Sequence, residues 1–420
     1  AIRQLAGRAA EFGICIDKAE VDFPGVMQHV RKVITRIEPH DSVERYTQLG
    51  VECLQGAARI VSPWCVEVDG KPLTTRGIIL ATGARPLLPP IPGLADVDAR
   101  TSETIWNLPV LPRRLLVLGA GPVGCELAQA FARLGSEVTL VNRRERLLPG
   151  EDPEVSALVE AGLAEDGTRV RHGTEIVSCA RQAGGSGSAL LSDGEQLEFD
   201  VLLLAVGRSP NTEGLGLEAL GVLDDENGSL SVDASLQTAC PTIFACGDVV
   251  GPYRFTHMAS FQAWYASINS LFGFLRRFRI AYRVVPRAVF TDPEVARVGI
   301  NEKEALEQGI RYELSRWSLA ELDRAIADGN ARGEIKVLTA PGTDRLLGVT
   351  ITGAHAADSL TQFTLAMTHG LGLKKVLSTI HLYPGYAESG KFVAGVWRKN
   401  HAPQWVYPWL ERLHRWRRNQ

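Results

Sequence analysis

Three glycines between two apolar strands constrain this fold most strongly. The stretch RRLLVLGAGPVGCELAQAFARLGSEVTLVNRRERLLP opens with an apolar run at 115–118, turns through Gly119, Gly121 and Gly124, and continues as a helical pattern to about residue 134. A second apolar run follows at 137–141. Strand, glycine turn, helix and second strand in this order are typical of a dinucleotide-binding βαβ unit. The sequence therefore predicts an α/β domain with parallel strands.

Each of the three glycines has a different physical task. Gly119 permits the tight turn, Gly121 lets a pyrophosphate approach the backbone, and Gly124 lets the helix pack closely on the strand. The N-terminus of the helix then offers free N–H groups and a partial positive charge to the phosphates. We expect these residues to bind a dinucleotide.

The residues after the second strand indicate which ribose is bound. Sites for NAD favour an acidic residue there, which holds the 2′-hydroxyl. This chain has Asn142, Arg143 and Arg144 instead, and guanidinium groups pair well with a 2′-phosphate. The sequence favours NADP, while NAD stays possible because the two arginines could also form a solvated face.

Two further strand ends have the composition of a ligand crevice. An apolar run at 78–81 enters a turn at Thr82 and Gly83, and the run PTIFACGDVVG ends its strand at Gly247 and Asp248. Small residues at the carboxyl end of a strand leave room for a ligand, and an aspartate there can accept hydrogen bonds from sugar hydroxyls. Either run alone would indicate only an ordinary strand end.

Five motifs follow one another in a characteristic order. They are ATGARP at 81–86, GAGPVG at 119–124, AVGRSPN at 205–211, IFACGDV at 243–249 and HLYPGYAE at 381–388. In this order they resemble the pyridine nucleotide–disulfide oxidoreductases, the flavoprotein family of glutathione reductase, dihydrolipoamide dehydrogenase and mercuric reductase. The resemblance covers nearly the whole chain and is greatest to mercuric-reductase-like members.

The resemblance implies an α/β fold with two Rossmann-like nucleotide-binding domains and a C-terminal α+β dimerisation domain. A split FAD-binding domain would comprise 1–110 and 238–282, with the NAD(P)-binding domain inserted at 111–237. The dimerisation domain would follow at 283–420, where GEIKVLT and RLLGVTITG predict paired strands and 357–370 predicts a helix.

The resemblance also assigns residues to the two cofactors, FAD and a nicotinamide nucleotide. Thr82 and Gly83 would lie near FAD, and Asp248, next to Gly247, would bind its ribityl chain. Gly207 would border the nicotinamide nucleotide.

A helix and one acidic residue complete the implied flavin site. Phe255, Thr256 and His257 would start a helix whose N-terminus faces the flavin ring, with Thr256 as its cap. Glu126, on the glycine-loop helix, matches a family glutamate that pairs with a lysine beside the flavin.

One part of the family pattern does not occur before residue 81. Members open with their own glycine-rich βαβ unit for FAD, followed by a C-x-x-x-x-C redox pair and the lysine. Either the chain is a piece of a longer enzyme, which the lack of an initiator Met favours, or it is a shortened protein with an incomplete FAD site. The seven cysteines include no C-x-x-C or metal-type cluster, so buried, reduced thiols and no metal site are expected.

The last motif departs from the dithiol pattern H-P-T-x-x-E, whose His shuttles protons and whose Glu orients it. Tyr383 stands at the His position, Gly385 replaces Thr, and Glu388 is retained. A phenol with a pKa of about 10 is no base at neutral pH, and a nearby carboxylate raises that pKa further. Thiol-shuttling catalysis is therefore disfavoured. His381 is an alternative base, although a lone His beside apolar residues is more often structural.

Relatives of this kind form a two-fold dimer in which the last motif completes the partner's active site. A tyrosine at this position is familiar from mercuric-reductase-like proteins, but no cysteine follows Cys246 to hand over a metal. Mercury is therefore disfavoured as the electron acceptor.

The C-terminal stretch VWRKNHAPQWVYPWLERLHRWRRNQ is rich in Trp and Arg. From residue 409 onward it predicts a helix with Leu410, Leu413 and Trp416 on one face and arginines around it. Packing at the dimer edge is favoured over contact with an acidic partner or a membrane surface.

Bulk properties narrow the function further. The chain has 420 residues, enough to form several hydrophobic cores. Its net charge of −3 produces no overall electrostatic field that would attract nucleic acid. No run reaches the roughly 18 apolar residues of a membrane span, and no export signal is recognisable, so a cytoplasmic protein is expected.

These observations predict a homodimeric FAD-dependent NAD(P)H oxidoreductase. It would pass hydride from nicotinamide to flavin and electrons onward to an unidentified small-molecule acceptor. Two alternatives remain: a truncated, non-catalytic NADP(H)-binding protein, and a partner- or membrane-docking module that acts through the tail.

Overall fold

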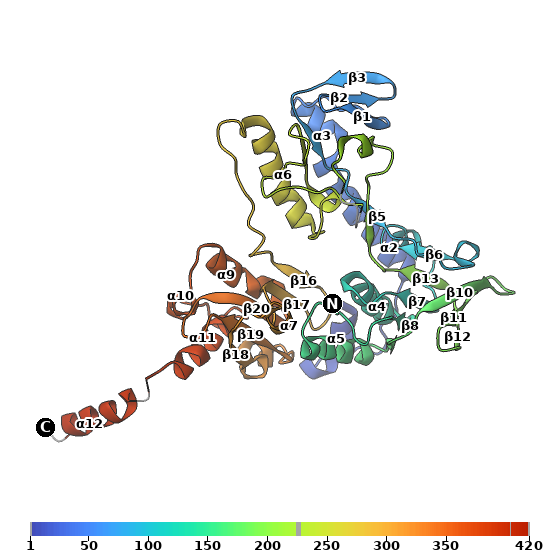
Figure 1. Ribbon diagram of the computed structural model, residues 1–420. Coiled ribbons are helices and arrows are strands. Elements are labelled where there is room, and N and C mark those ends of the chain that lie inside the picture. The colour runs from blue at the N-terminus through green and yellow to red at the C-terminus, as the bar shows by residue number, and fades with distance from the viewer. Residues whose placement is uncertain (1, 224–227, 404, 419–420) are drawn as a thin grey trace. The chain divides into compact units, whose positions relative to one another are not determined.

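The structure is a computed structural model that describes residues 2–223, 228–403 and 405–418. The chain divides into two compact units (Figure 1). Unit 1 comprises Ala1–Glu145 and Asp166–Tyr282, and unit 2 comprises Arg146–Glu165 and Arg283–Gln420. Each unit has its own hydrophobic core.

The predicted βαβ unit forms the centre of a parallel sheet in unit 1. β7 (Arg114–Leu118), α4 (Pro122–Leu134) and β8 (Glu137–Val141) follow within a residue of the expected bounds. β7 is buried almost throughout, as strands covered on both faces are. The helix ends at Gly135, whose φ of 112° gives a left-handed cap.

Three more strands complete this sheet in the order β6-β13-β7-β8-β9, with every pair parallel. An antiparallel sheet in the order β10-β11-β12 accompanies it. The bounds of these strands are β6 Ala99–Thr101, β9 Arg169–Arg171, β10 Ile176–Arg181, β11 Gly187–Leu191, β12 Gln196–Phe199 and β13 Val201–Leu204.

The rest of unit 1 is built around two short parallel strands, β4 (Ile78–Leu80) and β15 (Ile243–Ala245). The long helix α6 (Thr256–Phe272) packs against both of them. Two connecting strands, β5 (Ala84–Pro86) and β14 (Arg208–Pro210), pair antiparallel. The N-terminal part supplies α1 Ile2–Gly7, α2 Phe23–Ile37, α3 Val43–Gln48 and the antiparallel strands β1 Ala58–Ser62, β2 Cys65–Val68 and β3 Lys71–Thr74.

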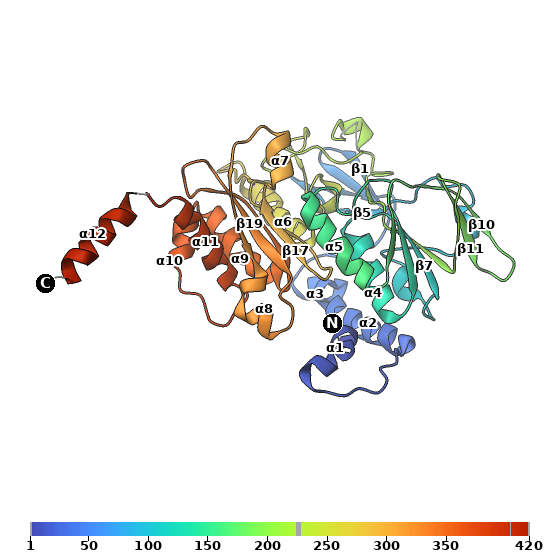
Figure 2. The ribbon, with the colours of Figure 1, turned by 90° about the horizontal axis from the view of Figure 1, so that it is seen from below.

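Unit 2 is an antiparallel sheet in the order β16-β17-β20-β19-β18, with helices packed on it (Figure 2). Helices α9, α10 and α11 bury their apolar faces against Ile335, Val337, Val349 and Ile351. The strands are β16 Arg287–Val289, β17 Val295–Gly299, β18 Glu313–Ser318, β19 Gly333–Thr339 and β20 Leu346–Gly353. The helices are α5 Pro153–Glu165, α7 Glu302–Glu307, α8 Asp323–Ala327, α9 Ala356–Thr368, α10 Leu373–Ser378, α11 Glu388–Asn400 and α12 Val406–Arg418.

Alternate residues of β17 and β19 point away from the apolar core. Arg297 and Lys336 both lie opposite Thr350 of β20, and both are almost completely buried. Two buried cations require anionic partners, because an unpaired buried charge is very costly. Carboxylates from the segment around α5 and from α7 supply them.

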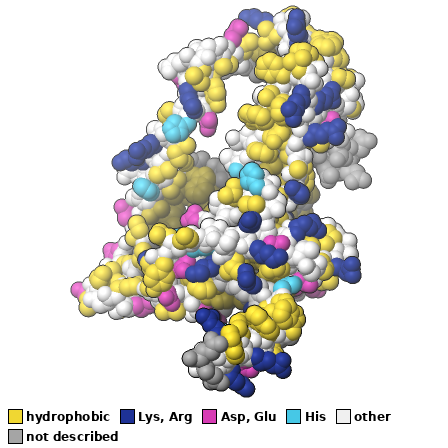
Figure 3. Space-filling view, turned by 90° about the vertical axis from the view of Figure 1, so that its left-hand side faces the viewer, with side chains coloured by type: hydrophobic (Ala, Val, Ile, Leu, Met, Phe, Trp, Pro, Cys, Tyr) yellow, Lys and Arg dark blue, Asp and Glu magenta, His cyan; other side chains and the backbone are white. Residues whose placement is uncertain are grey.

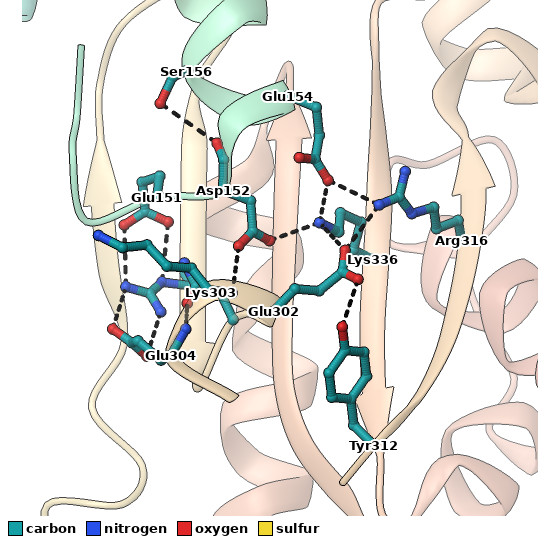
Figure 4. A network of polar contacts seen from close by, with 12 residues as sticks. Glu151, Asp152, Glu154, Ser156, Glu302, Lys303, Glu304, Tyr312, Arg316 and Lys336 are labelled. Atoms are coloured by element: carbon teal, nitrogen blue, oxygen red, sulfur yellow. Dashed lines mark hydrogen bonds and ion pairs between the residues drawn. The ribbon is translucent and has the colours of Figure 1, made fainter. Parts of the chain in front are cut away.

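Figure 4 shows this network of ion pairs in unit 2. Arg297 contacts Glu304 at 2.7 Å and Glu151 at 3.0 Å. Lys336 donates to Asp152 at 2.6 Å and also contacts Glu154 and Glu302. The oxygens of these last three acids lie within 4.8 Å of one another, but the ammonium group of Lys336 already provides their counter-charge.

All seven cysteines are free thiols, and four of them are buried. The expectation of buried thiols is confirmed for this group, which comprises Cys125, Cys179, Cys240 and Cys246. It is wrong for Cys15, which is exposed, and for Cys53 and Cys65, which are partly exposed. These three lie in the N-terminal 77 residues, where few side chains are buried.

Among the helices that the structure describes, none combines the length and apolar character needed to cross a bilayer.

Candidate nucleotide-binding and active site

The turn between β7 and α4 has the geometry that its three glycines predict. Gly119 has a φ of +108°, and a Cβ there would lie 2.5 Å from the carbonyl oxygen of Ala205. A Cβ at Gly124 would lie 1.9 Å from the carbonyl oxygen of Gly119, so helix and strand touch at this point. A Cβ at Gly121 would meet nothing within 4 Å. The turn is thus packed at two glycines and open at the third.

The open side of this turn suits a pyrophosphate. Gly121 is the N-cap of α4 and Pro122 follows as the first helical residue, where its missing N–H costs nothing. The next N–H groups of the helix and its partial positive charge are directed toward this end, where they can bind an anion. The residues present therefore fit a nicotinamide nucleotide.

The three residues after β8 do not share one environment. Asn142 is buried, and its Oδ1 accepts a hydrogen bond from the backbone N–H of Arg144 at 3.1 Å. Arg143 and Arg144 are exposed, and neither forms an ion pair with another described residue. Asn142 thus shapes the turn, while the two guanidinium groups remain accessible to a ligand.

Two of the sequence motifs meet at the carboxyl end of β4. The hydroxyl of Thr82 donates to the carbonyl of Asn211 at 2.7 Å, and the side-chain amide of Asn211 donates back to the carbonyl of Thr82 at 2.9 Å. Gly83 and Gly207 both have positive φ, and a Cβ on either would meet nothing within 4 Å. The fold brings together residues that lie almost 130 positions apart and leaves open backbone beside them.

The motif at the end of β15 lies against α6. The backbone N–H of Gly247 donates to Oε1 of Gln262 at 2.8 Å, and Gln262 is completely buried. Asp248 is half-buried and lies 3.4 Å from Nε of Arg208. Since β4 and β15 are parallel neighbours, their carboxyl ends share one edge. The structure thus brings Thr82, Gly83, Gly207, Gly247 and Asp248 to the same part of unit 1.

The prediction that Thr256 caps α6 is wrong. Phe255 holds the N-cap position in an extended conformation, and Thr256 is already the first helical residue, so its hydroxyl cannot cap the turn that follows. No side chain caps this helix end. The rings of Phe255 and His257 stack with their centroids 5.2 Å apart. The N–H groups of the first turn therefore retain capacity for another acceptor.

The flavin end of an FAD molecule fits this edge better than its ADP end does. Open glycine backbone and Asp248 suit a ring and its polyol chain. Residues that follow Asp248 in the chain, including Val250 and Arg254, line a cavity of about 520 Å³ together with Leu230. Residues 2–77, all described, contain helices and an antiparallel sheet but no glycine turn between a parallel strand and a helix. Glu126 is half-buried on α4, and residues 2–77 contain no C-x-x-x-x-C motif followed by the family's lysine.

Tyr383 belongs to unit 2 and is 65% exposed. Its hydroxyl donates to Oδ2 of Asp323 at 3.0 Å. This hydrogen bond is the main cause that raises the pKa of Tyr383 above its ordinary 10.0, and the charge of Glu388 adds a smaller effect in the same direction. The expected upward shift is confirmed in direction, although most of it comes from Asp323.

The rest of the HLYPGYAE motif is held by its own domain. Both ring nitrogens of His381 lie near oxygen atoms, at 2.8 Å from Oε1 of Gln362 and 3.0 Å from the carbonyl of Thr379. Glu388 is buried at the start of α11. Tyr386 donates to Asp328 at 3.0 Å, and burial, followed by this bond, raises the pKa of Tyr386 to about 12.

Sequence reasoning missed three residues that contact this motif: Asp323, Asp328 and Gln362. All three lie 19 to 60 positions before their partners. No local pattern marks them, because single acidic or amide residues in or next to a helix are common. Their role follows only from the packing of α8 and α9 beside the motif.

Two family domains match the chain. Residues 8–263 match the pyridine nucleotide-disulphide oxidoreductase domain, and residues 285–393 match the dimerisation domain of the same family. The predicted architecture of two Rossmann-like domains and a dimerisation domain is confirmed.

The chain is also similar in sequence to known proteins of this kind. A mercuric reductase of Lysinibacillus sphaericus is 33% identical over 91% of this chain and 70% of its own length. A dihydrolipoyl dehydrogenase of Thermus scotoductus is 37% identical over 80% of this chain and 73% of its own length.

Solved structures show the same fold. The HOCl-induced flavoprotein disulfide reductase RclA from Escherichia coli has a TM-score of 0.81 at 26% identity, covering 90% of this chain and 86% of that chain. LpdA from Mycobacterium tuberculosis has a TM-score of 0.85 at 24% identity, covering 94% and 86%, which shows the fold alone. The chain therefore belongs to the pyridine nucleotide-disulphide oxidoreductase family, whose members are oxidoreductases that use FAD and NAD(P)H.

Proposed function

We propose that this chain works as a cytoplasmic, homodimeric oxidoreductase that uses NADPH and FAD to reduce a small-molecule acceptor. The observation that carries this proposal is the meeting of Thr82, Gly83, Gly207, Gly247 and Asp248 at one edge of unit 1, which also contains the open glycine turn. When bound, NADPH supplies a hydride that FAD accepts, and the electrons then leave for the acceptor. In this proposal 1–110 and 238–282 hold FAD, 111–237 hold NADPH and 283–420 form the dimer.

On the NADPH side, the chain contributes position and charge. The turn at Gly121 and the start of α4 would bind the pyrophosphate, and Gly207 would border the nicotinamide half. The exposed Arg143 and Arg144 would bind the 2′-phosphate, because no acidic residue stands at the end of β8 to hold a free 2′-hydroxyl. NADPH is therefore preferred over NADH.

On the flavin side, the strand ends would orient the ring. Asp248 would accept hydrogen bonds from the polyol chain, and Thr82 and Gly83 would leave room for the ring beside them. The first turn of α6, with its uncapped N–H groups, would stabilise negative charge that develops on the ring.

On the acceptor side, Tyr383 and Glu388 of one protomer would complete the site of its partner. Tyr383 keeps its proton at neutral pH, because Asp323 accepts its hydrogen bond and raises its pKa. A phenol in this state can donate a hydrogen bond but cannot deprotonate a thiol. The proposal therefore favours an acceptor that needs hydrogen bonding rather than proton removal.

Anaerobic reduction tests the proposal directly. The protein should be yellow, and NADPH should bleach its flavin absorbance faster than NADH does. Replacing Arg143 and Arg144 by Ala should remove most of this preference, while Arg181→Ala, an exposed arginine on β10, should leave it unchanged. Flavin absorbance that does not respond to either nucleotide would refute the proposal.

One competing function is nucleotide binding without turnover. It is favoured by the fit of the glycine turn to a nicotinamide nucleotide and by the missing second glycine turn in residues 2–77. Calorimetry with each cofactor separates the two. Stoichiometric FAD binding supports the enzyme, whereas NADPH binding without any FAD binding supports the competing function.

A further inference from the structure

The last helix of the chain, α12 (Val406–Arg418), lies outside both family domains. The dimerisation domain match ends at residue 393, and α11 ends at Asn400. No residue of α12 is buried. Trp405, Trp409 and Trp416 are 69%, 54% and 59% exposed. Large apolar side chains of this kind are rarely left exposed in a group without a function.

The apolar residues of α12 gather on one face. With about 3.6 residues per turn, Val406, Leu410 and Leu413 fall close to Trp409 and Trp416, within about a third of the helix circumference. Figure 3 looks onto the side where α12 lies and shows hydrophobic side chains next to Lys and Arg at its lower edge. The helix is thus amphipathic, and among the described residues nothing covers its apolar face.

The polar side of the helix is strongly basic. Between residues 398 and 418 the only acidic residue is Glu411, against six Arg and Lys, although the whole chain has a net charge of −3. Four of the six lie on α12: Arg415 and Arg418 on the polar side, Arg412 at the border of the apolar face, and Arg417 in the last turn beside the apolar residues. Positive charge is therefore concentrated next to the exposed Trp side chains.

We propose that α12 lies in the headgroup region of an anionic membrane and holds the enzyme at that surface. A helix with Trp and Leu on one face and Arg around that face buries its apolar side chains at the boundary between headgroups and acyl chains. Indole rings favour this region, and each arginine gains electrostatic attraction to anionic lipids, such as those of the cytoplasmic leaflet. The proposal does not depend on which acceptor the enzyme reduces.

Other occupants fit these side chains less well. A second copy of α12 packed on the apolar face would bring Arg412 and Arg417, which lie at the border of that face and within it, toward the same positive charges of the copy, which repels. An acidic protein would pair with the arginines but would not by itself explain three exposed Trp side chains. Only a membrane surface, which is both anionic and apolar, can bind the arginines and the apolar side chains of α12 together.

Vesicle flotation of the whole protein tests the proposal. We expect binding to vesicles of phosphatidylcholine with phosphatidylglycerol, little binding to pure phosphatidylcholine, and loss of binding between about 0.1 M and 1 M salt, because the Debye length falls from about 10 Å to about 3 Å. Arg412→Gln with Arg415→Gln should weaken binding about 30-fold, from about 1 kcal/mol for each arginine. Trp409→Ser with Trp416→Ser should weaken it at least about tenfold.

Matched controls make the test specific. Phe274→Ser removes an aromatic side chain that is 83% exposed in unit 1, and it should leave vesicle binding unchanged. Every variant should keep the NADPH-dependent activity of the parent protein, so a failure of the redox proposal is recognised separately.

Several results would overturn the proposal. Equal binding to both kinds of vesicle would do so, as would unchanged binding of either α12 variant or a loss that Phe274→Ser alone causes. If truncation after residue 403 dissociates the dimer, α12 packs at the dimer edge instead. Retention on polyaspartate without vesicle binding would identify an acidic protein as the partner.

Discussion

Gly121 and Gly124 lie three positions apart, yet a methyl group should have different effects on them. Gly121 has a φ of −77° and open space around it, so Gly121→Ala should change the free energy of unfolding by less than about 1 kcal/mol. The methyl group would project where the phosphate approaches, so we expect NADPH affinity to fall at least about tenfold, since 1.4 kcal/mol corresponds to tenfold. Calorimetry and thermal unfolding measure the two quantities.

Gly124→Ala provides the matched comparison. Its Cβ would overlap the carbonyl oxygen of Gly119, so α4 must move away from β7, at a cost of about 1–3 kcal/mol in the free energy of unfolding. If both variants lost stability equally, the open space at Gly121 would have no relation to a ligand.

Tyr383 is expected to act as a hydrogen-bond donor and not as a base. Tyr383→Phe should therefore lower kcat by less than about tenfold, whereas removal of a general base costs about 10²–10⁴. The main effect should be a higher KM for the acceptor. Steady-state kinetics measure both constants, and a kcat loss of the larger size would contradict the assignment.

At the scale of elements, the alternating strand residues of β17 and β19 make unit 2 dependent on buried ion pairs. Lys336→Met would leave Asp152, Glu154 and Glu302 together without their buried cation. Removing one partner of a buried ion pair costs about 3–5 kcal/mol, because the remaining charge stays desolvated. We expect unit 2 to lose stability by this amount, measured by hydrogen exchange in its strands.

An exposed ion pair in the same unit serves as the control. Arg324 pairs with Asp328 on the surface at 2.7 Å, and Arg324→Met should change the stability by no more than about 1 kcal/mol. Equal effects of both substitutions would mean that burial does not determine the contribution of Lys336.

The same ion pairs predict how the stability of unit 2 depends on pH. Burial is the largest single influence and raises the pKa of Glu302 and Glu304. The hydrogen bonds and charges of their partners together outweigh it, chiefly Lys336 and Arg316 at Glu302 and Arg297 at Glu304, so both pKa values lie below 4.5. Groups with lowered pKa stabilise the fold fully above the unfolded value and lose that contribution as pH falls through the folded value. The unfolding temperature should therefore fall below about pH 4.5, the unfolded pKa.

Glu151 opposes this trend. Burial is the main cause that raises its pKa, so its ionised form destabilises the fold and its protonation on acidification has a stabilising effect. Glu151→Gln should therefore make the acid loss steeper. A stability curve that is flat between neutral pH and about pH 3 would show that these pairs contribute nothing.

At the scale of the whole molecule, the proposed active site needs two protomers. Gly121→Asp should disrupt the nucleotide-binding turn of one protomer, and Glu388→Gln should disrupt the HLYPGYAE motif of the other. If the motif completes the partner's site, a mixed dimer has one intact site and should show about half the activity of the parent dimer. Coexpression with two affinity tags isolates the mixed dimer. An inactive mixed dimer would place both elements in one protomer.

Much of the fold was predictable because its signals are local. The strand, glycine turn, helix and strand at 114–141 follow from periodicity and from Gly119 and Gly124, where only glycine fits, and the paired strands at 333–353 follow from alternating apolar residues. The cap of α6 was predicted one residue late. Capping preference favours Thr over Phe, and only the backbone conformation shows that Phe255 holds the cap position.

The sequence by itself determined the family, the order of the motifs and the absence of a base at position 383, since each depends on residue type and spacing alone. Only the tertiary structure decided which residues meet: Asn211 with Thr82, Asp323 with Tyr383, and Lys336 with the carboxylates around 152. These contacts join residues 60 or more positions apart. No short-range pattern specifies them, because they depend on how sheets and helices pack after each element has formed.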